Sequence, residues 1–158
     1  MKKASGGSYE EILARAIRFC EYQERCTRDV SRKLDGWELS AASKMKLLEQ
    51  LKELGCLDDE RYAMTYAGSK FRVNGWGKVR IRSELRVRQI SEGIIEKALG
   101  RIGQDAYVEE LDSILRKKKD SLKKYTTLEM KGRLYRFAVS RGYESGVINE
   151  ALNRIFID

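Results

Sequence analysis

The sequence has 158 residues, 42% of them hydrophobic and 35% charged, with a formal net charge of +8. A basic chain favours nucleic acid, an anionic membrane or an acidic partner protein. No apolar run approaches the roughly 18 residues that span a bilayer. Residues 1–7 are not followed by the apolar segment of a signal peptide. We therefore expect a soluble cytoplasmic protein that does not enter a membrane.

The residue types on which most enzymes and metal sites depend are absent or too few. The chain contains no histidine, and its three cysteines form no Cys-x-x-Cys pair. There is thus no imidazole base, no histidine to activate a cysteine, and no zinc-ligand spacing. The densest acidic cluster, residues 58–60, opens a predicted helix, where carboxylates offset the positive end of the dipole. We predict no catalytic residue, no metal and no cofactor.

Apolar residues recur at helical spacing along the whole chain. Four positions have N-cap chemistry, and two of them also have capping-box spacing to a glutamate: Ser8, Ser40, Ser91 and Thr126. Four glycines are expected to end helices: Gly36, Gly55, Gly103 and Gly142. In chain order the predicted helices cover 8–23, 27–36, 40–54, 58–73, 77–88, 91–101, 105–123, 127–141 and 144–156. The Asn74–Gly75 pair is interpreted as a turn between two helices, because its flanks do not alternate as strands do.

Two segments near the C-terminus repeat each other at a constant offset. Residues 90–102 and 143–155 share glycine, isoleucine, alanine, leucine, arginine and isoleucine at matching positions. A weaker echo lies in the N-terminal third, where leucines 47, 51 and 54 keep the same 4-then-3 spacing. These similarities predict an all-α protein of three tandem three-helix repeats, covering residues 1–57, 58–104 and 105–158. Because such a repeat is marginal alone, we expect the three to stack into an elongated, curved rod.

Basic residues gather most densely in the middle repeat. Seven lie between positions 70 and 88, with Glu84 as the only acid among them: Lys70, Arg72, Lys78, Arg80, Arg82, Arg86 and Arg88. Three of these, at four-residue intervals, form one stripe: Lys78, Arg82 and Arg86. Like charges at this spacing destabilise a helix by about 0.2–0.5 kcal/mol per pair, so an uncompensated stripe favours an anionic partner.

Two further features allow more than one interpretation. Trp76, between two glycines, can stack on a base, but is more simply a packing anchor between helices. The second basic run contains Lys117, Lys118 and Lys119. It is either a solvated helix face or a second binding surface, and nearby acids partly balance it.

Two motifs carry a resemblance to a known family. Residues 54–63 read LGCLDDERYA and resemble the RecX signature LGLLDDxRFA, and residues 75–85 read GWGKVRIRSEL, similar to that family's GxGxxRIxxEL. The resemblance implies tandem three-helix repeats that bind the RecA filament on single-stranded DNA, usually inhibit it, bind DNA weakly and use no cofactor. It also places Arg61, Lys78, Arg80, Arg82 and Glu84 at motif positions, with Asp58, Asp59 and Ile81 holding the fold.

The resemblance therefore implies a regulatory protein that modulates, chiefly inhibits, a RecA filament in DNA repair and the SOS response, and we expect it to act as a monomer. Its predicted filament- and DNA-binding residues are Arg61, Lys70, Arg72, Trp76, Lys78, Arg80, Arg82, Arg86, Arg88, Lys117, Lys118 and Lys119. The alternative is an autonomous DNA-binding protein. The predicted helix 77–88 offers no Asn or Gln to read base edges, so such binding would follow the backbone and depend steeply on salt.

Overall fold

The computed structural model describes residues 7–157, and every regular element in that range is an α-helix. In chain order the helices are α1 (Tyr9–Tyr22), α2 (Thr27–Asp35), α3 (Ala41–Glu53), α4 (Asp59–Arg72), α5 (Lys78–Val87), α6 (Glu92–Gly100), α7 (Gln104–Asp120), α8 (Thr127–Arg141) and α9 (Ser145–Ile155). They form three successive three-helix units: the first unit (α1–α3), the middle unit (α4–α6) and the third unit (α7–α9). The predicted all-α fold of three-helix repeats is confirmed.

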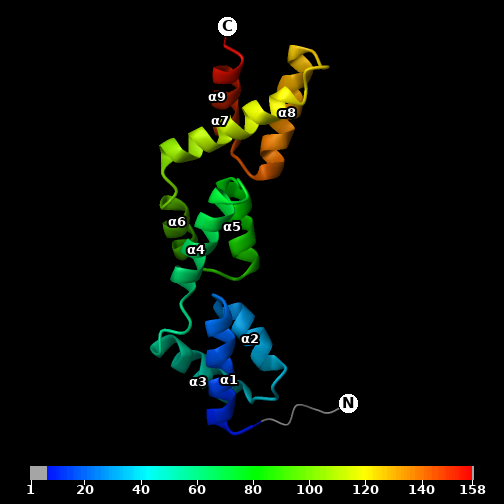
Figure 1. The fold of residues 1–158 in the computed structure, drawn as a ribbon. Helices are drawn as coiled ribbons and strands as arrows, with labels where there is room; N and C mark the ends of the chain where they lie inside the picture. The colour runs from blue at the N-terminus through cyan, green and yellow to red at the C-terminus, as the bar shows by residue number, and fades with distance from the viewer. Residues whose placement is uncertain (1–6, 158) are drawn as a thin grey trace.

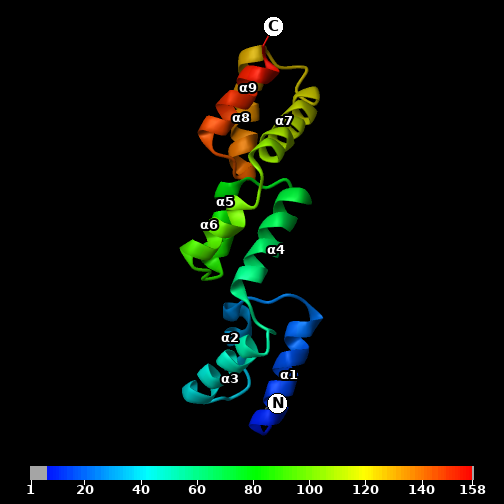
Figure 2. The same cartoon turned by 90° about the vertical axis from the view of Figure 1, so that its left-hand side faces the viewer.

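The three units follow one another in a line, from the N-terminal end to the C-terminal end of the molecule (Figure 1). The view turned by 90° shows the same order, with the middle unit separating the other two (Figure 2). Each unit therefore meets only its neighbour in sequence, as in other stacked repeat proteins.

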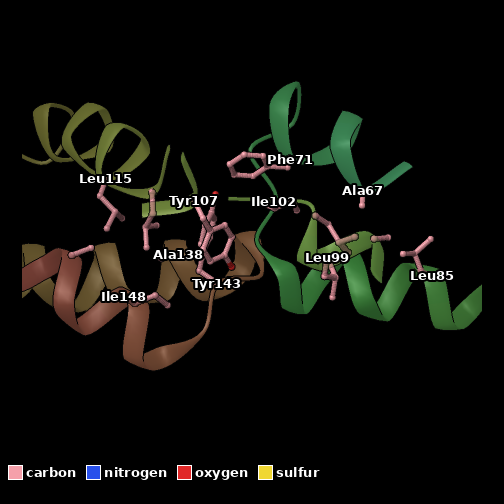
Figure 3. Close-up of a cluster of buried hydrophobic side chains, with 14 of the residues drawn as sticks. Ala67, Phe71, Leu85, Leu99, Ile102, Tyr107, Leu115, Ala138, Tyr143 and Ile148 are labelled. Carbon is pink, nitrogen blue, oxygen red and sulfur yellow. The ribbon is translucent and has the colours of Figure 1, made fainter. Parts of the chain in front are cut away.

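Buried side chains divide into two hydrophobic cores. The first unit has a core of its own, which includes Leu34, Leu47 and Leu51. The middle and third units share a second, continuous core. At their junction the ring of Phe71 lies 5.9 Å from that of Tyr107, which stacks at 5.0 Å on that of Tyr143 (Figure 3). The third unit is thus joined to the middle one by buried aromatic packing.

The helix starts follow the predicted caps at three of four positions. The side chains of Ser8, Ser40 and Thr126 each accept a backbone N–H of the first turn, and Thr126 forms a full capping box with Glu129. Ser91 occupies the N-cap of α6 without a side-chain bond. The predicted start signals therefore locate the helices correctly even where the hydrogen bond is not made.

Glycine ends helices at fewer positions than expected. Gly55 and Gly142 have positive φ angles of 74° and 95° and reverse the chain after α3 and α8. Gly36 ends α2 with an ordinary φ of −76°. Gly103 does not end a helix: it is the N-cap of α7, with a φ of −62°.

The leucine trio of the first unit is only partly buried, contrary to the repeat pattern. Leu47 and Leu51 are fully buried, but Leu54 is 54% exposed. The reason is that α3 ends at Glu53, and the chain then turns back through Gly55. Leu57, 2% exposed, takes the core position instead.

The joint between the middle and third units is made by backbone groups in direct contact. The N–H of Gly77 donates to the carbonyl of Arg141 at 2.8 Å, and that of Val79 donates to the carbonyl of Gly142 at 2.9 Å. A Cβ atom on Gly77 would overlap the backbone of Gly142. Glycine at position 77 is therefore required by close approach.

Two buried tyrosine hydroxyls complete this joint. Tyr143 donates to the carbonyl of Gly75 at 3.0 Å, while Tyr107 accepts the N–H of Lys78 at 2.9 Å and donates to Glu144. Burial raises the pKa of both phenols, so they stay protonated and able to donate.

The joint between the first and middle units is mainly polar. The backbone N–H and hydroxyl of Thr27 both donate to one carboxylate oxygen of Asp59, at 2.7 and 3.0 Å. Arg61 donates to Glu24 at 2.6 Å. Among the described residues that precede α4, Cys26 alone has its side chain buried in the second core. Loss of these few contacts would leave the first unit with its own intact core.

Candidate functional site

The most distinctive surface of the middle unit is a row of three half-buried aromatic side chains, Tyr62, Tyr66 and Trp76, called here the aromatic row. Tyr62 stacks on Tyr66 with 5.9 Å between ring centroids, and Tyr66 meets Trp76 edge-on at 6.5 Å. The two tyrosines lie one turn apart on α4, and Trp76 stands in the turn before α5. The row therefore runs along α4 toward the third unit.

Three cations stack on the rings of the aromatic row. The ammonium of Lys70 lies 5.5 Å from the Tyr66 centroid and 4.9 Å from that of Trp76. The guanidinium of Arg80 lies 4.0 Å from the Trp76 centroid, and that of Arg88 lies 4.7 Å from the Tyr66 centroid. Each contact contributes about 0.5–1 kcal/mol at an exposed site. Arg88 also forms an ion pair with Glu84 at 3.0 Å. Lys70 and Arg80, which form no ion pair among the described residues, are held in place with their charge available to an anion.

A hollow of about 310 Å³ borders the aromatic row on the side of the first unit. Tyr62, Tyr66 and Lys70 line it from α4, and Gln23 and Glu24 line it from the end of α1. Burial raises the pKa of both tyrosines, although the Arg88 charge opposes this effect. The hollow therefore presents neutral aromatic surface beside a cation, which suits a planar base as well as an apolar side chain.

The predicted stripe of uncompensated charge on α5 is wrong for two of its three members. Arg82 binds Glu96 through two nitrogens at 3.2 and 3.1 Å. Arg86 binds Glu92 in the same way at 2.6 and 3.1 Å, and this hydrogen bonding lowers the pKa of Glu92. Both acids belong to α6, which lies beside α5 only after folding. The two arginines therefore already have anionic partners.

The remaining predicted residues of the middle unit are spread over several faces. Arg61 lies in the joint with the first unit, where it binds Glu24 and the carbonyl of Gly55. Lys78 covers the ring of Tyr107 at 4.9 Å, in the joint with the third unit. Arg72 is exposed and lines a separate groove with Arg101. These side chains do not converge with the aromatic row.

The second basic run lies on α7, in the third unit. Lys118 covers the ring of Phe137 at 5.1 Å, and Lys119 covers that of Phe156 at 4.5 Å. Lys117 is exposed. The structure thus brings together Lys70, Trp76, Arg80 and Arg88 from the predicted set, and places the α7 lysines in another unit.

The sequence reasoning missed the two tyrosines of the row. Tyr62, Tyr66 and Lys70 are spaced four residues apart, the interval that places side chains on one face of a helix. That spacing is the signal that would have found them.

Two negative findings apply to residues 7–157. Within this range no helix is long and apolar enough to cross a membrane. The same residues contain no group of three or more Cys, Asp or Glu side chains placed to hold a metal ion.

Comparison with known proteins decides the family. Residues 58–99 match the model of "RecX, second three-helix domain", and residues 105–152 match that of "RecX, third three-helix domain". The regulatory protein RecX of Chlorobium phaeobacteroides is 36% identical over 141 residues, which cover 89% of this chain and 91% of that protein. The chain belongs to the RecX family.

Other RecX proteins agree with this assignment. The regulatory protein RecX of Clostridium acetobutylicum is 30% identical over 153 residues, covering 94% of this chain and 71% of the relative. The crystal structure of RecX from Lactobacillus salivarius has a TM-score of 0.89 at 17% identity, and covers 95% of this chain and 97% of that one. The structure therefore has the RecX fold, and the named relatives support a RecX regulatory role.

The two RecX motifs lie at the two joints of the middle unit. Residues 54–63 supply the Asp59 and Arg61 contacts to the first unit. Residues 75–85 supply Gly75 and Gly77, which meet the third unit. In this chain much of the signature thus fixes one unit against the next, while Arg80 in the second motif is exposed.

Proposed function

We propose that this RecX chain binds the RecA filament on single-stranded DNA and modulates it, chiefly by inhibiting strand exchange, ATP hydrolysis and co-protease activity. Family membership supports the RecA partner. The observation that carries the proposal is the aromatic row with its stacked cations beside an open hollow. Such a surface suits a partner that offers both acidic groups and DNA.

The proposed mechanism is steric and needs no catalysis by this chain. Three units in a line reach across neighbouring RecA protomers, so several weak contacts act together and raise the overall affinity. The hydrogen-bonded joint between the middle and third units keeps their spacing fixed, which reduces the entropy lost on binding. A rod held in this way blocks entry of the duplex that would exchange strands with the filament. We propose that it acts as a monomer in the cytoplasm.

The test is co-sedimentation of the protein with bacterial RecA on single-stranded DNA and a non-hydrolysable ATP analogue. Lys70→Ala/Arg80→Ala removes two cations from the aromatic row, and we expect filament binding to weaken at least about tenfold, as charged contacts contribute about 1.5–3 kcal/mol each. The matched control is Arg82→Ala/Arg86→Ala, which removes the same charge from α5. Since those arginines already bind Glu96 and Glu92, this control should weaken binding much less.

A parallel assay of RecA ATP hydrolysis reports the functional consequence. The wild-type chain should lower the rate, and the Lys70→Ala/Arg80→Ala variant should require a higher concentration for the same effect. Equal loss of filament binding in both double variants would show that the aromatic row is not the site. Failure of the wild-type chain to alter ATP hydrolysis or strand exchange would contradict the proposed function itself.

The second candidate is an autonomous DNA-binding protein without sequence preference. Arg80 and Ser83 are exposed on α5, and neither is an amide side chain of the kind that reads the edge of an adenine base. These two residues therefore weakly favour DNA binding without sequence preference. On this hypothesis the protein would sediment with bare DNA as strongly as with the filament. Its binding would also fall steeply as salt rises.

A further inference from the structure

The groove that Arg72 and Arg101 line lies where α4, α6 and the first turn of α7 meet, and is called here the α4–α6 groove. It has a volume of about 420 Å³. Its wall on α4 consists of Met64, Gly68 and Arg72, which follow one another at four-residue intervals. The aromatic row begins two positions earlier, at Tyr62, and successive helical residues are rotated by about 100°. The groove therefore opens on nearly the opposite side of α4 from the aromatic row.

The floor of the α4–α6 groove is apolar. Phe71, Ala98 and Ile102 line it, and all three belong to the second core. Phe71 and Ile102 lie at the corner where the middle unit meets the third (Figure 3). Phe71 supplies the one aromatic ring of the lining and is only 8% exposed, so it offers almost no ring face to a stacking base. The floor suits an apolar side chain, which gains free energy by leaving water.

The rim of the groove carries two exposed guanidinium groups, those of Arg72 and Arg101. Neither has a carboxylate within 4 Å among the residues that the structure describes, in contrast to Arg82, which is paired with Glu96. The lining itself contains no acid. An external carboxylate can therefore bind both guanidinium groups without first breaking an ion pair, and the fork of N–H donors on each matches a carboxylate.

The start of α7 adds to the positive potential at the rim. Gly103 lines the groove and is the N-cap of α7, where no side-chain hydrogen bond caps the helix. The first N–H groups of a helix have no partner within the helix, and this end carries about half a positive charge. Asp105, in the first turn, offsets part of this charge but does not line the groove. The rim thus attracts carboxylates from all three helices.

Gly68 keeps the groove open. A glycine inside a helix is less stable than an alanine, and the φ angle of Gly68 is not one that requires glycine. A Cβ atom at this position would stand 2.9 Å from a guanidinium nitrogen of Arg72. The side chain of Arg72 therefore lies across Gly68, and a larger residue at position 68 would displace it and fill the space.

We propose that the α4–α6 groove binds a short acidic peptide segment of a partner protein. One apolar side chain of the peptide lies on the floor, and carboxylates on either side of it bind Arg72, Arg101 and the start of α7. The apolar floor and the lack of an exposed ring favour a peptide over a nucleic acid. Because the groove and the aromatic row lie on different sides of α4, the middle unit can bind at both surfaces at once. The inference goes beyond the proposed function and does not depend on it.

Anisotropy of a fluorescein-labelled peptide of sequence DEDLEDE, measured without RecA and without DNA, tests the inference. Arg72→Ala/Arg101→Ala should weaken peptide binding at least about tenfold, because hydrogen bonds between charged groups are the strong ones. The matched control is Arg18→Ala/Arg32→Ala, which removes the same charge from two exposed positions of the first unit and should keep most of the affinity. Equal weakening in both double variants would overturn the inference.

A second pair of variants tests the space and not the charge. Gly68→Leu should abolish most of the peptide binding and leave the urea midpoint of unfolding unchanged or raised, since leucine is a better helix former than glycine. The matched control is Gly132→Leu on α8, where an arginine also follows four residues later and lies 3.5 Å from the position of the added Cβ atom. This control should bind the peptide as the wild type does. A folded Gly68→Leu variant with unchanged affinity would contradict the proposed groove.

Two altered peptides show what the groove recognises. NQNLQNQ, which lacks the carboxylates, should bind at least about tenfold more weakly, and DEDGEDE, which lacks the apolar side chain, should bind several-fold more weakly. If DEDGEDE binds as tightly as DEDLEDE, the peptide is held only by general attraction to a basic chain, and the inference fails.

Competition distinguishes the other possible occupant. Unlabelled DEDLEDE should displace the labelled peptide at a lower concentration than oligo(dT) of equal total charge. Displacement at equal concentrations would assign the groove to a nucleic acid and overturn the inference. Loss of RecA modulation with intact peptide binding would contradict the proposed function alone.

Discussion

At the scale of single residues, the glycines of the 75–85 motif show how a sequence pattern can be right for a reason that the sequence does not reveal. Gly77 has an ordinary φ of −80°, so it is not needed for a left-handed turn. It is needed because the backbone of Gly142 lies where a Cβ atom would stand. No property of residues 75–85 alone predicts this contact, since Gly142 is 65 positions further along the chain.

We therefore expect Gly77→Ala to destabilise the protein by about 1–3 kcal/mol, the usual range for overpacking. The measurement is urea unfolding followed by circular dichroism. The control is Gly93→Ala on α6, where the added methyl group meets open space and should stabilise by about 0.4–1 kcal/mol. An unchanged midpoint for Gly77→Ala would show that the joint adjusts freely.

The buried thiol of Cys26 gives a prediction about pH. Burial raises its pKa from 9.0 to about 11. The folded state thus favours the protonated thiol, while the unfolded state ionises first. The contribution of Cys26 to stability is therefore complete below pH 9 and is lost as the pH rises toward 11.

The alkaline loss of stability should be smaller in Cys26→Ala than in the wild type, as measured by urea unfolding between pH 8 and about 11. The quantity to compare is the slope of the unfolding free energy against pH, and not the free energy itself. This comparison removes the effect of the cavity that the substitution leaves. The half-buried Cys56 should react with a thiol reagent in the folded protein, whereas Cys26 should react only on unfolding. Identical slopes of the unfolding free energy against pH in Cys26→Ala and the wild type would contradict a buried Cys26 thiol with a raised pKa.

At the scale of helices, sequence reasoning was most successful, because helix starts and buried faces depend on neighbours within one turn. The repeat offset correctly pairs Ile95 with Ile148, which are both fully buried. It failed where a helix ended early, as at Leu54. It also failed where side chains of two helices form an ion pair, as Arg86 of α5 does with Glu92 of α6. Pairing across helices depends on packing that no local pattern contains.

The cap of α8 tests the local part of this reasoning. Thr126→Ala removes a side-chain acceptor and half of a capping box, so we expect a loss of about 1 kcal/mol in the free energy of unfolding. Ser91→Ala is the matched control, since Ser91 caps α6 without a side-chain bond and should cost much less. Equal losses at both positions would mean that residue type, and not the hydrogen bond, determines the effect.

At the scale of the whole molecule, the two cores imply two levels of cooperativity. The first unit buries its own core, while the middle and third units share another. Leu51→Ala should therefore speed amide hydrogen exchange throughout α1–α3 and leave α7–α9 nearly unchanged. Leu111→Ala, in the shared core, should speed exchange in both the middle and third units. Uniform acceleration by Leu51→Ala would show that the chain opens as one unit.

The candidate site shows the limit of prediction at this scale. The sequence predicted binding through the basic residues between positions 70 and 88, with the stripe of Lys78, Arg82 and Arg86 at its centre. The structure places two others of this set, Lys70 and Arg80, over the ring of Trp76. The sequence could not show which cations are already paired, because their partners lie on other helices. The third predicted repeat, residues 105–158, has a formal charge of only +2, because acids at both of its ends offset the charge of +8 on residues 116–141. Its total charge therefore concealed the imbalance within it.

That imbalance has a consequence for how the molecule approaches a partner. Within the third unit a formal charge of +8 on residues 116–141 is separated from −6 on residues 105–115 and 142–158 together, so this unit has an electric dipole moment. In the field of a polyanion this dipole favours the orientation in which the end of α7 and α8 face the polyanion. At about 1 M salt the Debye length shrinks to about 3 Å, and this preference is lost.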